Sequence, residues 1–401
     1  MHFTANPSQF FANQTIFLTG GTGGLGGCLL YKLTMQVNTA KIYVLVRRSV
    51  AHAVARWRQT MPHQIGEILA TKKIHFIVGD IIKPHCGIEP AVLSEMASTV
   101  TLIIHAAASI NLSNRLRETV SENCLPTLAL AQLASTFNNL TRFIYISTAY
   151  ANSFLPDGVV EEKIYETGDA EKQLGEILET GTLSQCVDCP WPYAVGKNIT
   201  ERLLISRNPS LPLLIVRPSM IAPAISQPFP YYGPSGSCPM STYIRSYMDS
   251  PDSGVFHVSR RHPRGSNIVD EIPVDLVANL ILLHIMHDTA GVVHATGQSY
   301  AYQSLAQLHA DMRPHIPRGL TAPGPPFRYV TDKRIPQGRL AGFWKAMGRD
   351  WHFSAEASRS FEALDGPLSI ALGDHDVSQF MQERARRIAE ESAGTQPRAR
   401  L

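Results

Sequence analysis

The chain has 401 residues, of which 44% are hydrophobic and 17% charged, and its formal net charge is +3. Such a chain is globular with a large core, and its length suggests about two or three domains. The small charge, without a basic stripe interleaved with aromatic residues, argues against nucleic-acid binding. No apolar run is long enough to span a bilayer, and residues 1–12 lack the apolar centre of a secretory signal.

The six cysteines do not show the spacing of a disulfide framework. Cys186 and Cys189 form a C-x-x-C pair, but no second pair or histidine cluster completes a zinc site. We therefore expect free thiols, no metal site and a reducing, cytoplasmic environment.

Residues 14–37 combine a short apolar run, a glycine-rich turn and a helical pattern. Glycines let the backbone turn tightly and approach a pyrophosphate, whose charge the following helix N-terminus attracts. An isolated glycine triplet is also common in ordinary turns, but here it lies between a strand and a helix, which predicts the first βα unit of a dinucleotide-binding sheet. The expected cofactor contacts in this turn are Gly20, Thr22, Gly23, Gly24, Leu25 and Gly26.

A second apolar run, 41–46, ends in Arg47 and Arg48. In a dinucleotide-binding sheet, the end of the second strand meets the adenosine ribose, where a carboxylate favours NAD and arginine suits the 2′-phosphate of NADP. Two arginines and no carboxylate at this point predict NADPH as the cofactor. The alternative is that both arginines are solvated loop charges.

Two further expected strands, 74–79 and 101–105, end in residues that suit a cofactor lying across the strand ends. After the first strand, an aspartate could reach the adenine amino group and an isoleucine could pack on the adenine ring. After the second strand, alanines leave room for the cofactor. Capping of the strand end explains the aspartate equally well. The residues concerned are Asp80, Ile81, Ala106, Ala107 and Ala108.

Strands and helices continue to alternate through the expected strands 142–146 and 213–217. This alternation predicts an α/β fold, a Rossmann-type doubly wound parallel sheet. Pro218 and Ser219, which follow the last of these strands, are also expected to contact the cofactor.

The expected domain organisation follows from where the alternation stops. Residues 1–220 are assigned to the NADP-binding domain, and the helix and strand within about 268–298 complete its sheet. Prolines and glycines accumulate in 221–267, which with 299–401 is expected to form substrate-binding loops and a smaller, mainly helical C-terminal subdomain, or cap.

Tyr193 and Lys197 are four residues apart on an expected helix and so share one face. A nearby ammonium stabilises a phenolate and should lower the pKa of the tyrosine towards neutrality. Thr148, after the fifth strand, could hold the reacting oxygen beside Tyr193. A Tyr-x-x-x-Lys pair alone is common on surface helices, but its position behind the glycine turn and the Ser-Thr strand end makes it a strong signal.

At these residues the chain resembles the extended short-chain dehydrogenase/reductases, over roughly residues 14–295. The resemblance implies Thr148, Tyr193 and Lys197 as the catalytic set, with Lys197 also contacting the nicotinamide ribose. It further implies, more weakly, that Asn123 supports the lysine through water and contributes to the cofactor site.

Several segments are similar to one branch of that family, the male-sterility branch, which comprises fatty acyl-CoA reductases and the thioester reductase domains that release polyketide and peptide chains. They are 19–26, 42–47, 146–150, 216–219 and 272–275, together with the loop 233–236. The resemblance implies NADPH-dependent reduction of an acyl thioester, on coenzyme A or a carrier protein, to an aldehyde or alcohol.

After Ala295 the chain no longer resembles the fatty acyl-CoA reductases, and no membrane anchor is seen. We therefore expect a soluble thioester reductase with a short cap, acting on a substrate carried by another molecule. We also expect a monomer, since no heptad pattern appears.

Other functions use the same fold. A ketone or aldehyde reductase, or a sugar-nucleotide epimerase, would share the glycine turn and the Tyr-Lys pair, so only the substrate side, 221–265, can separate them. A non-catalytic NADP-binding regulator is less favoured, because it need not keep Thr148, Tyr193 and Lys197 together.

Overall fold

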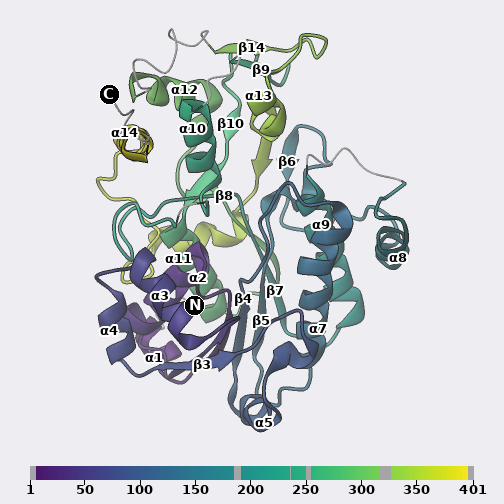
Figure 1. Cartoon of the computed structure of the whole chain (residues 1–401), viewed down its shortest axis with the longest axis vertical. Helices are drawn as coiled ribbons and strands as arrows, with labels where there is room; N and C mark the ends of the chain where they lie inside the picture. The colour runs from purple at the N-terminus through teal and green to yellow at the C-terminus, as the bar shows by residue number, and fades with distance from the viewer. Residues whose placement is uncertain (1–5, 185–190, 235, 250–253, 316–326, 396–401) are drawn as a thin grey trace, which may run out of the picture.

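The computed structural model describes residues 6–184, 191–234, 236–249, 254–315 and 327–395. A seven-stranded parallel sheet forms its centre, in the order β12-β7-β5-β4-β1-β2-β3 (Figure 1). The strands are β1 Thr15–Thr19, β2 Lys41–Val46, β3 Ile74–Val78, β4 Leu102–His105, β5 Arg142–Ile146, β7 Leu213–Pro218 and β12 Gly291–Ala295.

The strand order reverses between β1 and β4, which creates the crevice where such sheets bind ligands. β1 pairs on one side with β2 and on the other with β4, so that Thr19 lies opposite His105. The central strands are buried on both faces, which explains their nearly continuous apolar sequences. The predicted Rossmann-type α/β fold is confirmed.

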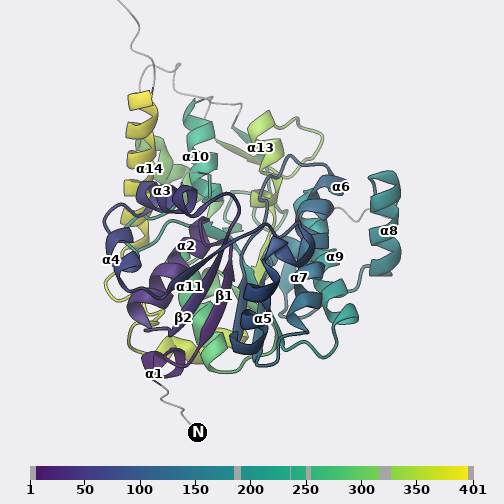
Figure 2. The same ribbon diagram turned by 60° about the horizontal axis from the view of Figure 1, so that its bottom comes forward.

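Helices cover both faces of the sheet (Figures 1 and 2). One face carries α2, α3, α4 and α11, and the other carries α5, α7 and α9. Each side has its own hydrophobic core, built from the apolar sides of these helices. The helices are α2 Gly24–Tyr31, α3 Val50–Thr60, α4 Ile65–Ala70, α5 Pro90–Thr99, α7 Leu125–Ala134, α9 Pro192–Arg207 and α11 Val274–Met286.

A third hydrophobic core belongs to the cap, which lies beyond the carboxyl ends of the strands (Figure 1). Besides helices, the cap contains short strand pairs that join distant segments: β6 with β15, β9 with β14, and β8 with β11. These elements are β6 Gly158–Val160, β8 Met220–Ala222, β9 Val255–His257, β11 Glu271–Pro273, β14 Arg328–Val330 and β15 Trp351–Phe353, with helices α10 Pro239–Asp249, α12 Leu305–Met312, α13 Arg339–Phe343 and α14 Val377–Thr395.

Part of the segment 299–401 packs against the sheet domain instead of the cap core. Phe361 contacts the ring of His284 on α11, with ring centroids 4.8 Å apart. The amide of Asn279 donates a hydrogen bond to the Ser369 carbonyl at 2.7 Å. The chain therefore returns from the cap to α11 before α14 closes the cap.

Within the described ranges, no helix is both long and apolar enough to cross a membrane.

Candidate active site

The glycine-rich turn packs directly against the end of β4. Gly20 has φ of +76°, and a Cβ there would lie 2.6 Å from the backbone of Ala106 and Ala107. A Cβ on Gly26 would lie 2.1 Å from the carbonyl oxygen of Gly20. These two positions therefore require glycine. The turn and the alanines after β4 form one continuous cradle, which suits the pyrophosphate of a dinucleotide.

The loop after β8 lies over the start of α2. The hydroxyl of Tyr232 donates a hydrogen bond to the Gly24 carbonyl at 3.0 Å, and a Cβ on Gly24 would lie 2.8 Å from Oγ of Ser237. Gly23 caps α2 without a side chain, and Thr22 and Leu25 flank it on the partly exposed turn. Tyr232 and Ser237 thus border the phosphate cradle, although the sequence predicted only substrate binding for their loop.

Arg47 and Arg48 are exposed directly after β2 and form no ion pair within the part of the chain that the structure describes. Val46 lies opposite Val78, so the arginines and Asp80 follow neighbouring strand ends. Asp80 accepts a hydrogen bond from the Ile82 N–H at 3.3 Å. This contact is the strand-end capping that the sequence offered as an alternative to adenine binding. Ile81 is half-buried beside it.

Asn123 organises the segment after β4. Its Oδ1 accepts from the Ser109 N–H at 2.7 Å and its Nδ2 donates to the Ser109 carbonyl at 2.9 Å. Asn123 lies in a π-helical turn, Val120–Cys124. The amide therefore fixes the backbone just beyond Ala108. Its support of Lys197 through water stays a prediction.

The structure gathers the three expected catalytic residues around the carboxyl end of β5. Thr148 is buried, donates to the Pro218 carbonyl at 3.4 Å and accepts from the Tyr150 N–H at 3.3 Å. α9 begins one residue before Tyr193 and packs against the turn 149–152. Lys197 donates to the Ile146 carbonyl at 2.7 Å, two residues before Thr148.

Burial sets the protonation of Tyr193 and Lys197 on α9. It lowers the pKa of the Lys197 ammonium to about 7, although the charge of Glu201 opposes the shift. It raises the pKa of the Tyr193 phenol. The expected lowering of the Tyr193 pKa is not found, because Nζ of Lys197 is 5.7 Å from the centroid of the tyrosine ring and points to Ile146.

A buried charged network lies next to Thr148 and Lys197. Arg217 and Glu201 form an ion pair at 2.5 Å, and their side chains are 0% and 1% exposed. Ser147 donates to Glu201 at 2.5 Å, which ties β5, β7 and α9 together next to Thr148. The sequence analysis missed Glu201, although its spacing of four from Lys197 on α9 was a usable signal.

Asp270 is a second residue that the sequence analysis missed. It is buried directly before β11, and burial raises the pKa of its carboxyl to about 6. A hydrogen bond from the Gly297 N–H opposes this shift. Its backbone carbonyl accepts from the Tyr150 hydroxyl at 3.4 Å. Ser219 is also buried here, and its N–H donates to the Ala295 carbonyl at 3.0 Å, so it supports the sheet edge beside the site.

Among the described residues, no cluster of three or more histidine, cysteine, aspartate or glutamate side chains could hold a metal ion. Cys186 and Cys189 lie outside the described residues.

Comparison with known protein families places this site in context. A family model for a NAD-binding domain, described as "Male sterility protein", matches residues 18–281. The chain is 29% identical over 314 residues to "Putative fatty acyl-CoA reductase CG8303" of Drosophila melanogaster, covering 71% of this chain and 56% of that protein. It is 28% identical over 298 residues to the human "Fatty acyl-CoA reductase 2", covering 69% and 55%. The chain thus spans about half the length of the curated relatives it matches.

Solved structures share the fold. The terminal R domain of the myxalamid PKS-NRPS pathway superposes with a TM-score of 0.65 at 19% identity, covering 95% of this chain and 91% of that one. The reductase domain of a Mycobacterium tuberculosis non-ribosomal peptide synthetase gives 0.62 at 19% identity, covering 97% and 96%. UDP-glucuronic acid 4-epimerase from Bacillus cereus, in complex with NAD, gives 0.59 at 13% identity, covering 94% and 100%.

Proposed function

The chain belongs to the male sterility protein family, and on that premise we propose that it is an NADPH-dependent reductase of acyl thioesters. The observation that carries this proposal is the position of Thr148 and Lys197 at the end of β5, with Tyr193 beside Lys197, next to a glycine cradle that fits a dinucleotide. The fatty acyl-CoA reductases among its relatives support the thioester as the substrate class.

The cofactor proposed here is NADPH rather than NADH. The cradle of Gly20, Gly26 and Ala106 would hold its pyrophosphate, and Arg47 and Arg48 would hold its 2′-phosphate, since neither arginine is engaged by a described carboxylate. When bound, NADPH supplies the hydride that reduces the carbonyl carbon.

The protein's own residues handle the oxygen and the proton. Thr148 and Tyr193 hydrogen-bond the oxygen as negative charge develops on it, and Tyr193 gives it a proton. A tyrosine whose pKa is raised by burial keeps that proton until the oxyanion forms. Lys197 stabilises the phenolate that remains. The resulting hemithioacetal breaks its C–S bond, releasing the thiol and leaving an aldehyde, which a second round would reduce to an alcohol.

Further properties belong to the same proposal. The acyl group is carried by coenzyme A or by a carrier protein, and the enzyme acts in the cytoplasm as a monomer that binds neither nucleic acid nor metal. Gel filtration with light scattering tests the oligomeric state. A mass of twice the 44.1 kDa chain would contradict the monomer.

The test of the activity is NADPH oxidation by the purified chain, with acyl-CoA thioesters and the matching free aldehydes offered in parallel. Thioester-dependent oxidation with release of free thiol is the expected result, and product analysis then separates aldehyde from alcohol. Oxidation with aldehydes or ketones alone would contradict the proposal and assign the chain to the carbonyl reductases.

A further inference from the structure

The cap contains a groove that the catalytic site does not use. It has a volume of about 1140 Å³ and lies between the segments 257–261, 331–337 and 345–351, with Asp157 at one side. This volume is on the order of the ~300–1000 Å³ of small-molecule sites. The groove is therefore large enough for a nucleotide-sized ligand.

The groove is strongly cationic. Of its carboxylates, Asp332 pairs with Arg334 at 2.8 Å and Asp157 pairs with Arg349 at 2.6 Å. Its other four lysine and arginine side chains are exposed and have no ion-pair partner among the residues that the structure describes. They are Arg260, Arg261, Lys333 and Lys345.

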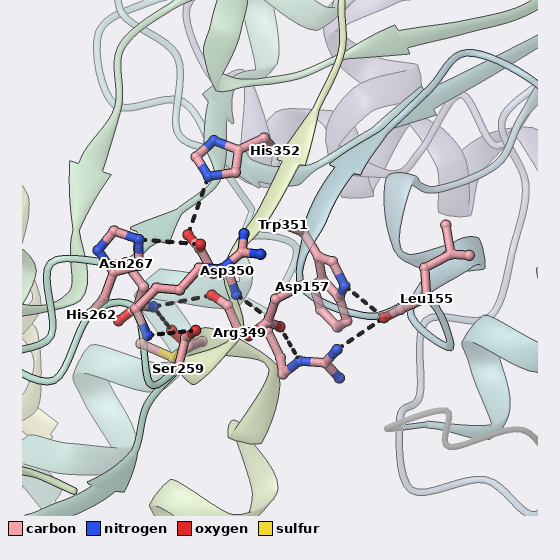
Figure 3. Close-up of polar contacts among 11 residues, drawn as sticks. Leu155, Asp157, Ser259, His262, Asn267, Arg349, Asp350, Trp351 and His352 are labelled. Atoms are coloured by element: carbon pink, nitrogen blue, oxygen red, sulfur yellow. Dashed lines mark hydrogen bonds and ion pairs between the residues drawn. The ribbon is translucent and has the colours of Figure 1, made fainter. Parts of the chain in front are cut away.

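The wall of the groove is held rigidly. The indole of Trp351 donates to the Leu155 carbonyl at 3.1 Å, and the Arg349 guanidinium stacks over its ring at 4.4 Å (Figure 3). The next residue, Asp350, is buried between His262 and His352, at 3.1 and 3.2 Å. These contacts hold the segment 349–352 in place, so little order has to be gained in this wall of the groove on binding.

This wall also reaches the catalytic centre. Trp351 packs edge-on against Tyr150, with ring centroids 6.1 Å apart. The backbone N–H of Tyr150 in turn donates to Oγ1 of Thr148. Trp351 and Tyr150 are thus the two side chains that link the wall of the groove to Thr148.

We propose that this groove binds the phosphorylated adenosine end of coenzyme A, with the pantetheine arm directed past Trp351 to Thr148. The inference rests on the proposed thioester reductase function. Coenzyme A carries a diphosphate and a 3′-phosphate, and the four unpaired cations match that charge. The concave shape favours this small ligand over the acidic surface of a carrier protein, which needs a broad contact area.

The test measures binding and turnover separately. Binding of coenzyme A to the full chain saturated with NADP⁺ is measured by calorimetry, for wild type, for the double variant Arg260→Ala/Lys345→Ala and for Arg264→Ala. Arg264 is an exposed arginine that does not line the groove. We expect the double variant to raise the Kd at least about ten-fold and Arg264→Ala to leave it unchanged, since one charge-assisted contact is worth about ten-fold.

In turnover, the same acyl group is offered on coenzyme A, on pantetheine and on a carrier protein. We expect wild type to prefer coenzyme A, and the ratio of kcat/KM for acyl-CoA to that for acyl-pantetheine to fall in the double variant. Unchanged coenzyme A binding in the double variant, or a wild-type preference for the carrier protein, overturns the assignment. Failure to reduce any thioester rejects the proposed function, whereas the binding experiment still decides whether the groove holds coenzyme A.

Discussion

Two charged regions of this chain differ in how their charges are satisfied. Beneath the candidate active site, Arg217 and Glu201 are buried and form an ion pair with each other. In the cap groove, Arg260 and Lys345 are exposed and have no described ion-pair partner. A paired buried charge fixes geometry and is costly to disturb, whereas an exposed free cation is available to an anionic ligand at little desolvation cost. Changes to the first region should therefore affect catalysis and folding, whereas changes to the second should affect only the binding of the anionic ligand.

The largest effect is expected for Tyr193→Phe, a change in the candidate active site itself. Removing the proposed proton donor should lower kcat by about 10²–10⁴-fold or more while NADPH binding persists, because the ring still fills its place. Stopped-flow NADPH oxidation and fluorescence titration measure the two effects. Tyr31→Phe, a change on α2, is the matched control and should retain activity. Undiminished turnover by Tyr193→Phe would remove this residue from the mechanism.

The second prediction concerns the buried ion pair. Arg217→Met should lower the free energy of unfolding by about 3–5 kcal/mol, because Glu201 is left buried and uncompensated. The exposed pair Arg207–Glu171 is the control, and Arg207→Ala should cost no more than about 1 kcal/mol. Urea unfolding followed by circular dichroism measures both. Equal losses would show that burial does not distinguish the two pairs.

The third prediction concerns the glycine cradle. Gly26→Ala forces a Cβ to within 2.1 Å of a carbonyl oxygen, so the turn must shift and we expect a loss of at least about 2 kcal/mol together with weaker NADPH binding. Gly66→Ala is the control, since its Cβ meets nothing within 4 Å on helix α4. It should stabilise the chain by about 0.4–1 kcal/mol. Thermal unfolding with and without NADPH separates these outcomes.

The glycine cradle and the Tyr193–Lys197 pair could be predicted from sequence because each depends on local spacing within one βα unit or one helix. The sheet could be predicted for the same reason, since the central strands are nearly continuous apolar runs. The pairing of β6 with β15 could not, because three-residue strands separated by about 190 positions leave no periodic signal.

The parts of the site that depend on burial by segments distant in the sequence could not be predicted either. The partnership of Arg217 with Glu201 and the burial of Asp270 arise only when β7, α9 and the segment before β11 meet. The same applies to the pKa of Tyr193, where spacing suggested stabilisation by Lys197 but burial dominates.

The fourth prediction tests the cofactor end of the cradle. Arg47→Ala/Arg48→Ala should raise the Kd for NADPH about ten-fold or more and leave that for NADH nearly unchanged, because only NADPH carries the 2′-phosphate. Isothermal titration with both nucleotides measures the ratio. Arg264→Ala again serves as the control for loss of surface charge. If the Kd values for NADPH and NADH rose by the same factor, the arginines would contribute to general packing rather than to recognition of the 2′-phosphate.

The smallest expected effect is a pH dependence that separates buried from exposed lysines. Lys197 has a pKa of about 7 in the folded chain, against 10.5 without perturbation. Between these values the unfolded chain holds a proton that the folded chain has lost, so this lysine makes stability rise with pH from 7 upwards. Buried thiols such as Cys28, whose pKa is raised, oppose the trend once free thiols ionise near pH 8.5.

The informative window is therefore about pH 7 to 8.5. There, Lys197→Met should flatten the slope of unfolding free energy against pH by at most about 1.4 kcal/mol per unit, the limit for one proton. Lys172→Met, on the exposed face of α8 Ala170–Thr180, should leave the slope as in wild type. A slope that Lys197→Met does not change would mean that the ammonium stays charged beside the Ile146 carbonyl, and Lys197 would then stabilise the Tyr193 phenolate more strongly than its burial implies.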